Sequence, residues 1–122
     1  MKLNIQKNQS VIFLPAQPPT IQTPATIVSG QESELICIAT SQSEGQVIWM
    51  GKKSGETVFS PAFADVALDE VTKQDSCGST HRITVRQVLD DSWNGAYVRC
   101  DVSIPASTSE EVQLVFSGEE GG

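Results

Sequence analysis

Two cysteines and the tryptophan between them constrain the fold of this chain more than any other feature. Each lies in a run where small or apolar residues alternate with larger or polar ones. A β-strand requires this period of two, because successive side chains point to opposite faces. The pattern therefore predicts three strands that turn one set of side chains toward a common core. That set is Leu35, Cys37 and Ala39 in the first run, Val47 and Trp49 in the second, and Ala96, Val98, Cys100 and Val102 in the third.

The arrangement resembles an immunoglobulin-superfamily domain over residues 18–117. In that family, a buried tryptophan packs against a disulfide that joins the two sheets of a sandwich. The resemblance implies an all-β fold, a two-sheet immunoglobulin-like Greek-key sandwich of the variable type or of a long intermediate type. It also implies a disulfide between Cys37 and Cys100. Strand parity then predicts a core made of Leu35, Val47, Trp49, Ile83, Val85, Val98 and Leu114.

The remaining strands follow from the same resemblance. Residues 18–37 are similar to the first strand, a turn and the second strand, and residues 81–88 to the E strand, in which Ile83, Val85 and Val88 are apolar. We assign the C′ strand to residues 57–59 and the G strand to residues 110–116. Between them, residues 60–79 leave room for a C″ segment and a D strand. Within that stretch, residues 62–68 fit either a helical turn or an edge strand, because their period is ambiguous.

One position departs from the family pattern. Val98 stands where the family usually has a tyrosine, two residues before the second cysteine, and Tyr97 falls on the opposite face. The hydrogen bond of the tyrosine corner is therefore predicted to be absent. Asn94 and Gly95 can supply a tight turn instead, because glycine accepts a positive φ and asparagine tolerates it. Trp93, beside them, is expected to cover the bottom of the core.

Both ends of the chain lie outside the resemblance. Residues 1–17 are either the last strand of a preceding domain or a genuine A strand, in which case residues 25–28 form A′. Residues 118–122 are expected to be a flexible tail. Asn8 begins an Asn-x-Ser sequon and is a candidate for N-linked glycosylation.

Charge and length limit the classes of partner. A chain of 122 residues forms one domain, and its net charge of −7, with eight dispersed basic residues, argues against nucleic acid or an anionic membrane as partner. No segment approaches the roughly 20 apolar residues that cross a bilayer, so we expect no membrane contact by the domain itself. A disulfide implies an oxidising compartment. The expected location is therefore extracellular, on a cell-surface ectodomain or in a secreted protein.

Few residues in the sequence suggest catalysis or metal binding. His81 is the only histidine and is expected at a solvated or rim position, while Asp90 and Asp91 lie in a turn where carboxylates bond to backbone amides or face water. No C-x-x-C spacing supports a zinc site. We therefore predict no enzymatic activity, no cofactor and no metal. Cys77, left over from the disulfide, is either an unpaired thiol without a role or the source of a bond to another chain or domain.

The same parity predicts an outward-facing patch on the sheet that contains Trp49. A mixture of apolar, aromatic and Arg residues has the composition of a protein-binding surface. The alternatives are ordinary surface or a face covered by a neighbouring domain. On the other sheet, Ile36 and Ile38 point outward, where residues 11–14 are a candidate cover. The predicted protein-binding residues are Ile48, Met50, Tyr97, Arg99 and Val115.

These observations favour a non-enzymatic recognition module of an adhesion protein, receptor or immune molecule. In the leading hypothesis, the domain binds another protein, or a second copy of itself, through the GFCC′ face. In the second, it is a secreted innate-immune molecule that binds a microbial or carbohydrate ligand through its tip loops, including residues 41–45. In the third, it is a spacer without a ligand. Substitution of Met50 and Tyr97 weakens binding in the first hypothesis only, and a spacer is insensitive to changes at either site.

Overall fold

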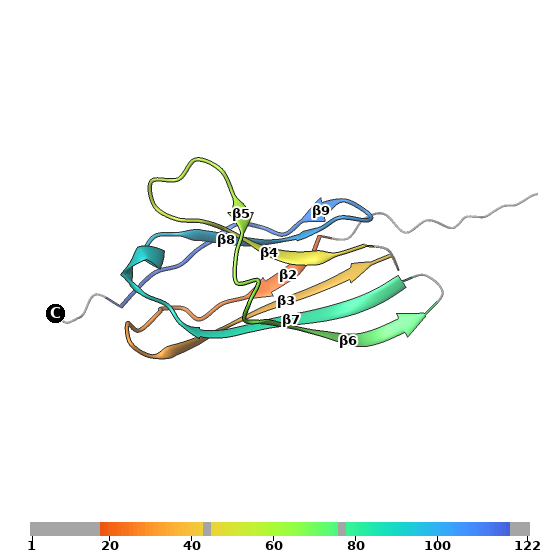
Figure 1. Cartoon of the computed structure of the whole chain (residues 1–122), viewed down its shortest axis with the longest axis horizontal. Coiled ribbons are helices and arrows are strands. Elements are labelled where there is room, and N and C mark those ends of the chain that lie inside the picture. Colours follow the sequence, from red (N-terminus) through yellow and green to blue (C-terminus); the bar gives the residue numbers. More distant parts are fainter. Residues whose placement is uncertain (1–17, 43–44, 76–77, 118–122) are drawn as a thin grey trace, which may run out of the picture.

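Two antiparallel β-sheets pack face to face in the computed structural model of the chain, which describes residues 18–42, 45–75 and 78–117 (Figure 1). One sheet has the order β2-β3-β7-β6 and the other β10-β8-β4-β5, with β9 also paired to β8. The first sheet contains β2 (Thr20–Gln22), β3 (Glu32–Ser41), β7 (Gly78–Val88) and β6 (Ala67–Asp75). The second contains β10 (Val112–Gln113), β8 (Tyr97–Val102), β4 (Val47–Lys52), β5 (Ser60–Pro61) and β9 (Ser107–Thr108). The predicted two-sheet immunoglobulin-like sandwich is confirmed.

The two sheets are joined by a disulfide at the centre of the core. Cys37 on β3 bonds to Cys100 on β8, and their Cα atoms lie 6.4 Å apart. Trp49 is the cross-strand neighbour of Cys100, and only 2% of its surface is exposed. Its Nε1–H donates a hydrogen bond of 3.2 Å to the carbonyl oxygen of Ile83 in the opposite sheet. The one polar atom of the indole is thereby satisfied inside the core.

All the residues expected in the core are buried, each at 7% exposure or less. Two further residues, Ile27 and Leu89, complete the core from segments between strands. Val88 is 52% exposed, whereas Leu89 is 1% exposed. Leu89 therefore closes the end of the core where β7 stops.

The C′ prediction is wrong by a few residues. Strand β5 covers Ser60–Pro61, opposite Gly51 and Met50, and residues 57–59 precede it as a loop. After β5 the chain turns back at Phe63, whose carbonyl accepts hydrogen bonds from Val66 N (3.1 Å) and Ala67 N (2.9 Å). Residues 62–66 therefore form a turn, and the edge strand β6 follows directly. Within residues 45–75 no C″ strand separates them, so the variable-type alternative is not confirmed.

Within the expected G strand, residues 110–116, only β10 is a regular strand, and a buried serine lies just before it. Ser109, at 5% exposure, accepts a hydrogen bond on its Oγ from Cys100 N at 2.9 Å, and its own N donates to the Cys100 carbonyl at 2.9 Å. A side chain thus takes the place of a strand carbonyl. As a result, the region 107–116 pairs with β8 in separate pieces: β9, then β10, then backbone bonds between Leu114 and the Gly95–Ala96 turn.

The chain crosses to the other sheet after β2. β2 pairs with β3, but Ile27 then forms a parallel bridge to Phe116, with its N donating to Val115 O at 2.7 Å. Residues 25–28 therefore include the expected A′ contact. The predictions for residues 1–17, for glycosylation at Asn8, for Cys77 and for the tail 118–122 fall outside the described residues.

The turn before β8 replaces the tyrosine corner. Ala96 N donates to Trp93 O at 3.1 Å, and Gly95 adopts a φ of 81° while Asn94 keeps a φ of −67°. Only the glycine takes the left-handed conformation, which suits the second central position of a type II turn. Val98 is completely buried at the position of the family's tyrosine. A backbone hydrogen bond therefore holds this turn, in place of the hydrogen bond of a tyrosine hydroxyl.

Replacing both Cys37 and Cys100 by alanine should lower the free energy of unfolding by about 4 kcal/mol. The bond spans a sequence separation of 63, and the chain-entropy model assigns about that stabilisation to a loop of this size. Urea denaturation of the oxidised protein measures the loss. A reducing agent should shift the wild-type midpoint toward that of the variant and leave the variant unchanged. Equal stability of oxidised wild type and variant would contradict the role of the bond.

Candidate functional site

The outer face of β4 and β8 carries a regular array of side chains. The antiparallel register places one residue of each strand directly opposite one of the other, and alternate pairs point away from the core. Ile48, the most exposed of the apolar ones, is 42% exposed. The outward pairs are Ile48 with Asp101, Met50 with Arg99, and Lys52 with Tyr97.

Aromatic rings and cations alternate across this face. The Arg99 guanidinium carbon lies 4.1 Å from the centre of the Phe59 ring, and Lys52 Nζ lies 5.2 Å from the same centre. Lys52 Nζ is also 5.5 Å from the centre of the Tyr97 ring. Contacts of this kind contribute roughly 0.5–1 kcal/mol each at exposed sites. We name Lys52, Phe59, Tyr97 and Arg99 the aromatic–cation cluster.

Hydrogen bonds fix the guanidinium of this cluster. Arg99 donates through Nε to Asp101 Oδ1 at 3.0 Å and through Nη2 to Asp101 Oδ2 at 3.3 Å. Its Nη1 lies 3.8 Å from Glu111 Oε2, and the Thr108 hydroxyl donates to Asp101 Oδ1. Both side chains of the Arg99–Asp101 pair are 25% exposed. The guanidinium plane is therefore held in one orientation while part of it faces solvent.

Four of the five predicted binding residues lie on this face: Ile48, Met50, Tyr97 and Arg99. Val115 is 51% exposed but lies beyond β10, where its carbonyl accepts the bond from Ile27.

Sequence reasoning missed the other half of the aromatic–cation cluster, Lys52 and Phe59. Lys52 has the same parity as Ile48 and Met50 on β4, so strand parity was the signal that it faces outward. Phe59 lies in the loop before β5, where strand parity gives no signal.

Trp93 covers one end of the core, as expected. Its ring stacks on Phe63 with centroids 4.8 Å apart, and Phe63 meets Trp49 edge-on at 6.3 Å. A Cβ at Gly51 would lie 3.0 Å from the Trp93 ring, so the absence of a side chain at Gly51 leaves space for this ring.

His81 belongs to a hydrogen-bonded chain of three side chains. Its Nδ1 lies 2.9 Å from Asp69 Oδ1, and its Nε2 lies 3.1 Å from Ser41 Oγ. The imidazole is 13% exposed, so of the two expected positions, solvated or rim, it occupies the rim. Its parity is that of the inward residue Ile83, which places it between the sheets at the β6 edge. A Ser–His–Asp chain can activate the serine as a nucleophile. Here Ser41 is only 1% exposed, so a substrate carbonyl cannot reach its oxygen. The Ser41–His81–Asp69 chain instead links three strands by hydrogen bonds.

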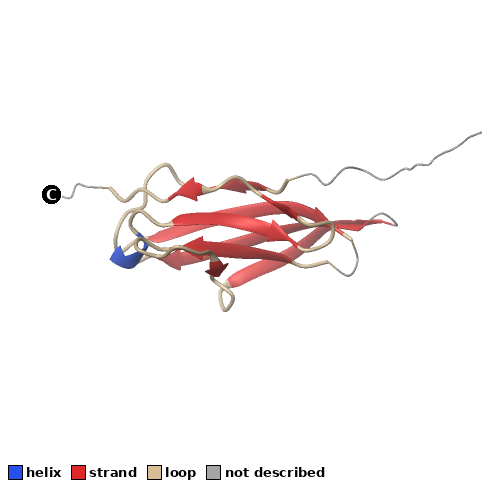
Figure 2. Ribbon diagram, turned by 90° about the horizontal axis from the view of Figure 1, so that it is seen from above, coloured by secondary structure: helices blue, strands red, loops and turns tan. Residues whose placement is uncertain are grey.

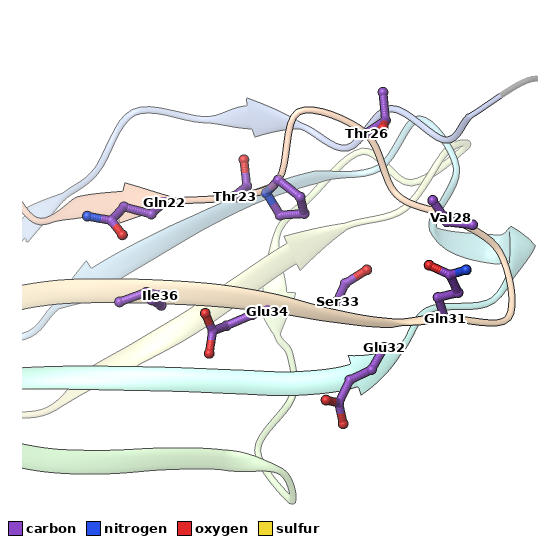
Figure 3. Close-up of a pocket in the computed structure, with 10 residues that line it drawn as sticks. Gln22, Thr23, Thr26, Val28, Gln31, Glu32, Ser33, Glu34 and Ile36 are labelled. Carbon is purple, nitrogen blue, oxygen red and sulfur yellow. The ribbon is translucent and has the colours of Figure 1, made fainter.

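A groove of about 410 Å³ opens where the chain leaves β2 and approaches β3 (Figure 3). Its walls are residues 22–28 on one side and the beginning of β3 on the other. The lining combines hydroxyl, amide and carboxylate groups with a similar amount of apolar surface. The lining residues are Gln22, Thr23, Pro24, Thr26, Val28, Gln31, Glu32, Ser33, Glu34 and Ile36.

Within the described ranges, no cluster of three or more His, Cys, Asp or Glu side chains is placed to hold a metal ion. Among the same residues, no helix is long and apolar enough to cross a membrane. The helix η1 (Asp91–Trp93) is short and lies at one end of the sandwich (Figure 2).

Comparison with known proteins does not assign the fold of this chain, so the assignment rests on the structure itself. No family model and no curated protein matches the sequence. Among solved structures it is similar to one described as IgNAR antibody domain C1, with 19% identity, a TM-score of 0.46, and coverage of 85% of this chain and 99% of that one. A likeness at that level adds no argument. The strand order of the two sheets, the disulfide between them and the tryptophan beside it decide the fold.

The chain has an immunoglobulin-like fold.

One carboxylate of this immunoglobulin-like domain has a shifted pKa. The Ser92 side chain and backbone both donate to Asp90, which caps η1, and these hydrogen bonds lower the pKa of Asp90 below its ordinary value of 3.8. A carboxylate that accepts such bonds is stabilised in its charged form. The cap therefore favours the folded state above pH 3.8, and this contribution is lost as the pH falls through the lower, folded pKa.

The Asp90→Asn variant should be less stable than the wild-type domain at pH 6, and the difference in melting temperature should shrink toward pH 2. Thermal unfolding of both proteins across that range measures it. Ser92→Ala removes one of the two donors and should reproduce part of the same trend. A difference that stays constant with pH would contradict the assignment of the cap.

Replacing Ser41 by alanine should lower the free energy of unfolding by about 1–2 kcal/mol, because it leaves His81 Nε2 without its partner in a largely buried position. Thr40→Ala is the matched control, since it removes an exposed hydroxyl that is hydrogen-bonded to Thr80. Urea denaturation compares them. Equal losses in the two variants would show that burial of the His81 chain does not matter.

Proposed function

We propose that this domain is an extracellular, non-enzymatic recognition module that binds another protein, with a second copy of itself as one candidate, through the outer face of β4 and β8. The observation that supports the proposal is the aromatic–cation cluster of Lys52, Phe59, Tyr97 and Arg99. The cluster uses residues of two sheet strands and of the loop before β5. It therefore forms only in the folded domain.

The composition of this face suits a protein partner. Aromatic residues, Met and Arg are enriched at the centres of protein interfaces, and Arg and Tyr are among the commonest residues that dominate binding energy. Met50 and Ile48 extend the cluster with apolar surface on the same strand. A partner that covers the rings would also remove water from the cations, which strengthens their attraction to the aromatic faces.

Fixed side chains lower the cost of binding. Arg99 is held by Asp101 and stacked on Phe59 before any partner arrives. Less side-chain entropy is then lost when an interface forms. Among the described residues, Lys52 has no salt-bridge partner, so its ammonium is the group that can pair with a carboxylate of the other protein.

The wider setting agrees with this role. A disulfide in the core is typical of proteins that work in oxidising surroundings outside the cell. The only Ser–His–Asp chain among the described residues has a buried serine, and an immunoglobulin-like fold generally supports binding rather than catalysis.

Phe59→Ala and Tyr97→Ala should each abolish or weaken binding through this face at least tenfold. Sedimentation velocity over a wide concentration range tests the homophilic case, since it needs no second protein: wild type should shift from monomer to dimer and the variants should not. Val58→Ala is the matched control, because Val58 is 70% exposed beside Phe59 but outside the cluster. Self-association that survives both variants, or that Val58→Ala also removes, would overturn the proposed face.

A monomer at every concentration leaves a different protein as the partner. In that case, display of the full-length protein on cells and the binding of soluble candidate ectodomains, measured with the same three variants, decides the question. Binding that depends on residues 41–45 and not on Phe59 or Tyr97 would instead favour the tip-loop hypothesis.

A further inference from the structure

One stretch of β3 lacks a strand partner on one side. β3 pairs with β7 along its whole length, but β2 covers only Ile36, Cys37 and Ile38. Among the described residues, 32–35 have no neighbouring strand on the β2 side. Alternate residues of a strand direct their N–H and C=O groups to each side, so about two residues of this stretch point backbone groups into the groove.

The sequence after β2 prevents that strand from continuing along residues 32–35 of β3. Pro24 follows β2 and has no N–H to donate to a neighbouring strand. Soon afterwards the chain has crossed toward the other sheet, where Ile27 bonds to Val115 and Ser117. The groove therefore results from the crossover and is part of the fold.

A buried hydroxyl points into the groove. Ser33 is 8% exposed, and in Figure 3 its side chain extends from β3 toward the segment that carries Thr26 and Val28. Among the described residues, its Oγ has no hydrogen-bond partner. Buried polar groups normally have partners, because an unsatisfied one costs about 1–3 kcal/mol. This hydroxyl therefore marks a position where a ligand atom can complete a hydrogen bond.

We propose that the groove binds an extended peptide segment of a partner protein that carries Lys or Arg, and that the segment adds a strand beside residues 32–35 of β3. Four strand residues span about 13 Å, at roughly 3.3 Å each. The backbone of the segment bonds to the free edge of β3, which is the usual source of affinity in strand addition.

The two faces of the added strand meet different surroundings. Side chains on its outer face lie beside Glu32 and Glu34, and those on its inner face lie beside Ser33. Glu34 already accepts a hydrogen bond from Arg86 at 2.7 Å, so Glu32 is the carboxylate available to a basic side chain. The segment should therefore alternate basic residues with small ones.

The lining favours a peptide over a sugar. Among the described residues that line the groove, none is an aromatic side chain on which a sugar ring could stack. Pro24, Val28 and Ile36 instead provide apolar contact at its margins. The site lies on the sheet opposite the aromatic–cation cluster, so it does not depend on the proposed function of that face.

Three blocked six-residue peptides test the proposal. In the first, lysine alternates with serine or valine; the second has glutamate in place of lysine; the third repeats the first with a central proline. The first should shift the amide NMR signals of residues 23, 25–28 and 32–35 of the full chain and slow hydrogen exchange at the free edge. The second should bind at least tenfold more weakly, because its glutamates are repelled by the carboxylates of the groove. The third should also bind at least tenfold more weakly, because its proline has no N–H to donate to the free edge of β3.

Glu32→Lys should lower affinity for the lysine peptide about threefold to fivefold, the range of one exposed charge pair. Glu70→Lys is the control, since it makes the same charge change at an exposed position of β6 in the same sheet. Tyr97→Ala should leave peptide binding unchanged, which separates this test from that of the other face.

Four results would overturn the proposal. They are no amide shift at millimolar lysine peptide, equal binding of the lysine and glutamate peptides, equal effects of Glu32→Lys and Glu70→Lys, and shifts of the same amides by maltohexaose but by none of the peptides.

Discussion

The covalent bond between β3 and β8 is the constraint on which the rest of this structure depends. It fixes the distance between two sheets and sets the parity of both strands, because each cysteine must point inward to reach the other. Trp49 lies beside the bond in the register and reaches across to Ile83 with its one polar atom. The remaining inward positions then fill with aliphatic side chains, and the outward positions become a defined surface.

That surface differs in character between the two sheets. On the β4–β8 side, outward side chains gather around Phe59, and Arg99 is oriented before any contact is made. On the other sheet the outer face carries an ion pair between Glu34 and Arg86, and the groove lies at its margin. We therefore propose two kinds of recognition for one small sandwich. One uses side chains on a sheet face, and the other uses backbone at a sheet edge.

How far the site could be predicted depended on whether its residues lie in regular strands. Ile48, Met50, Tyr97 and Arg99 follow strand parity from Trp49 and Cys100, so alternation alone placed them outward. Phe59 lies in a loop, where no period operates, and its contact with Arg99 joins residues that are far apart in sequence. The partners of His81 could not be predicted for a related reason: its hydrogen bonds to Asp69 and Ser41 join side chains from three different strands.

The sequence by itself determined the direction of the strand side chains, because that depends on a period of two. The fold class and the disulfide followed from the resemblance of the Cys37, Trp49 and Cys100 runs to the immunoglobulin superfamily. Only the tertiary structure decided where strands begin and end. Ser109 separates β9 from β10 by bonding to Cys100, and Pro24 and Ile27 direct the chain from β2 to the other sheet. Such events depend on hydrogen bonds between distant segments, which local alternation does not encode.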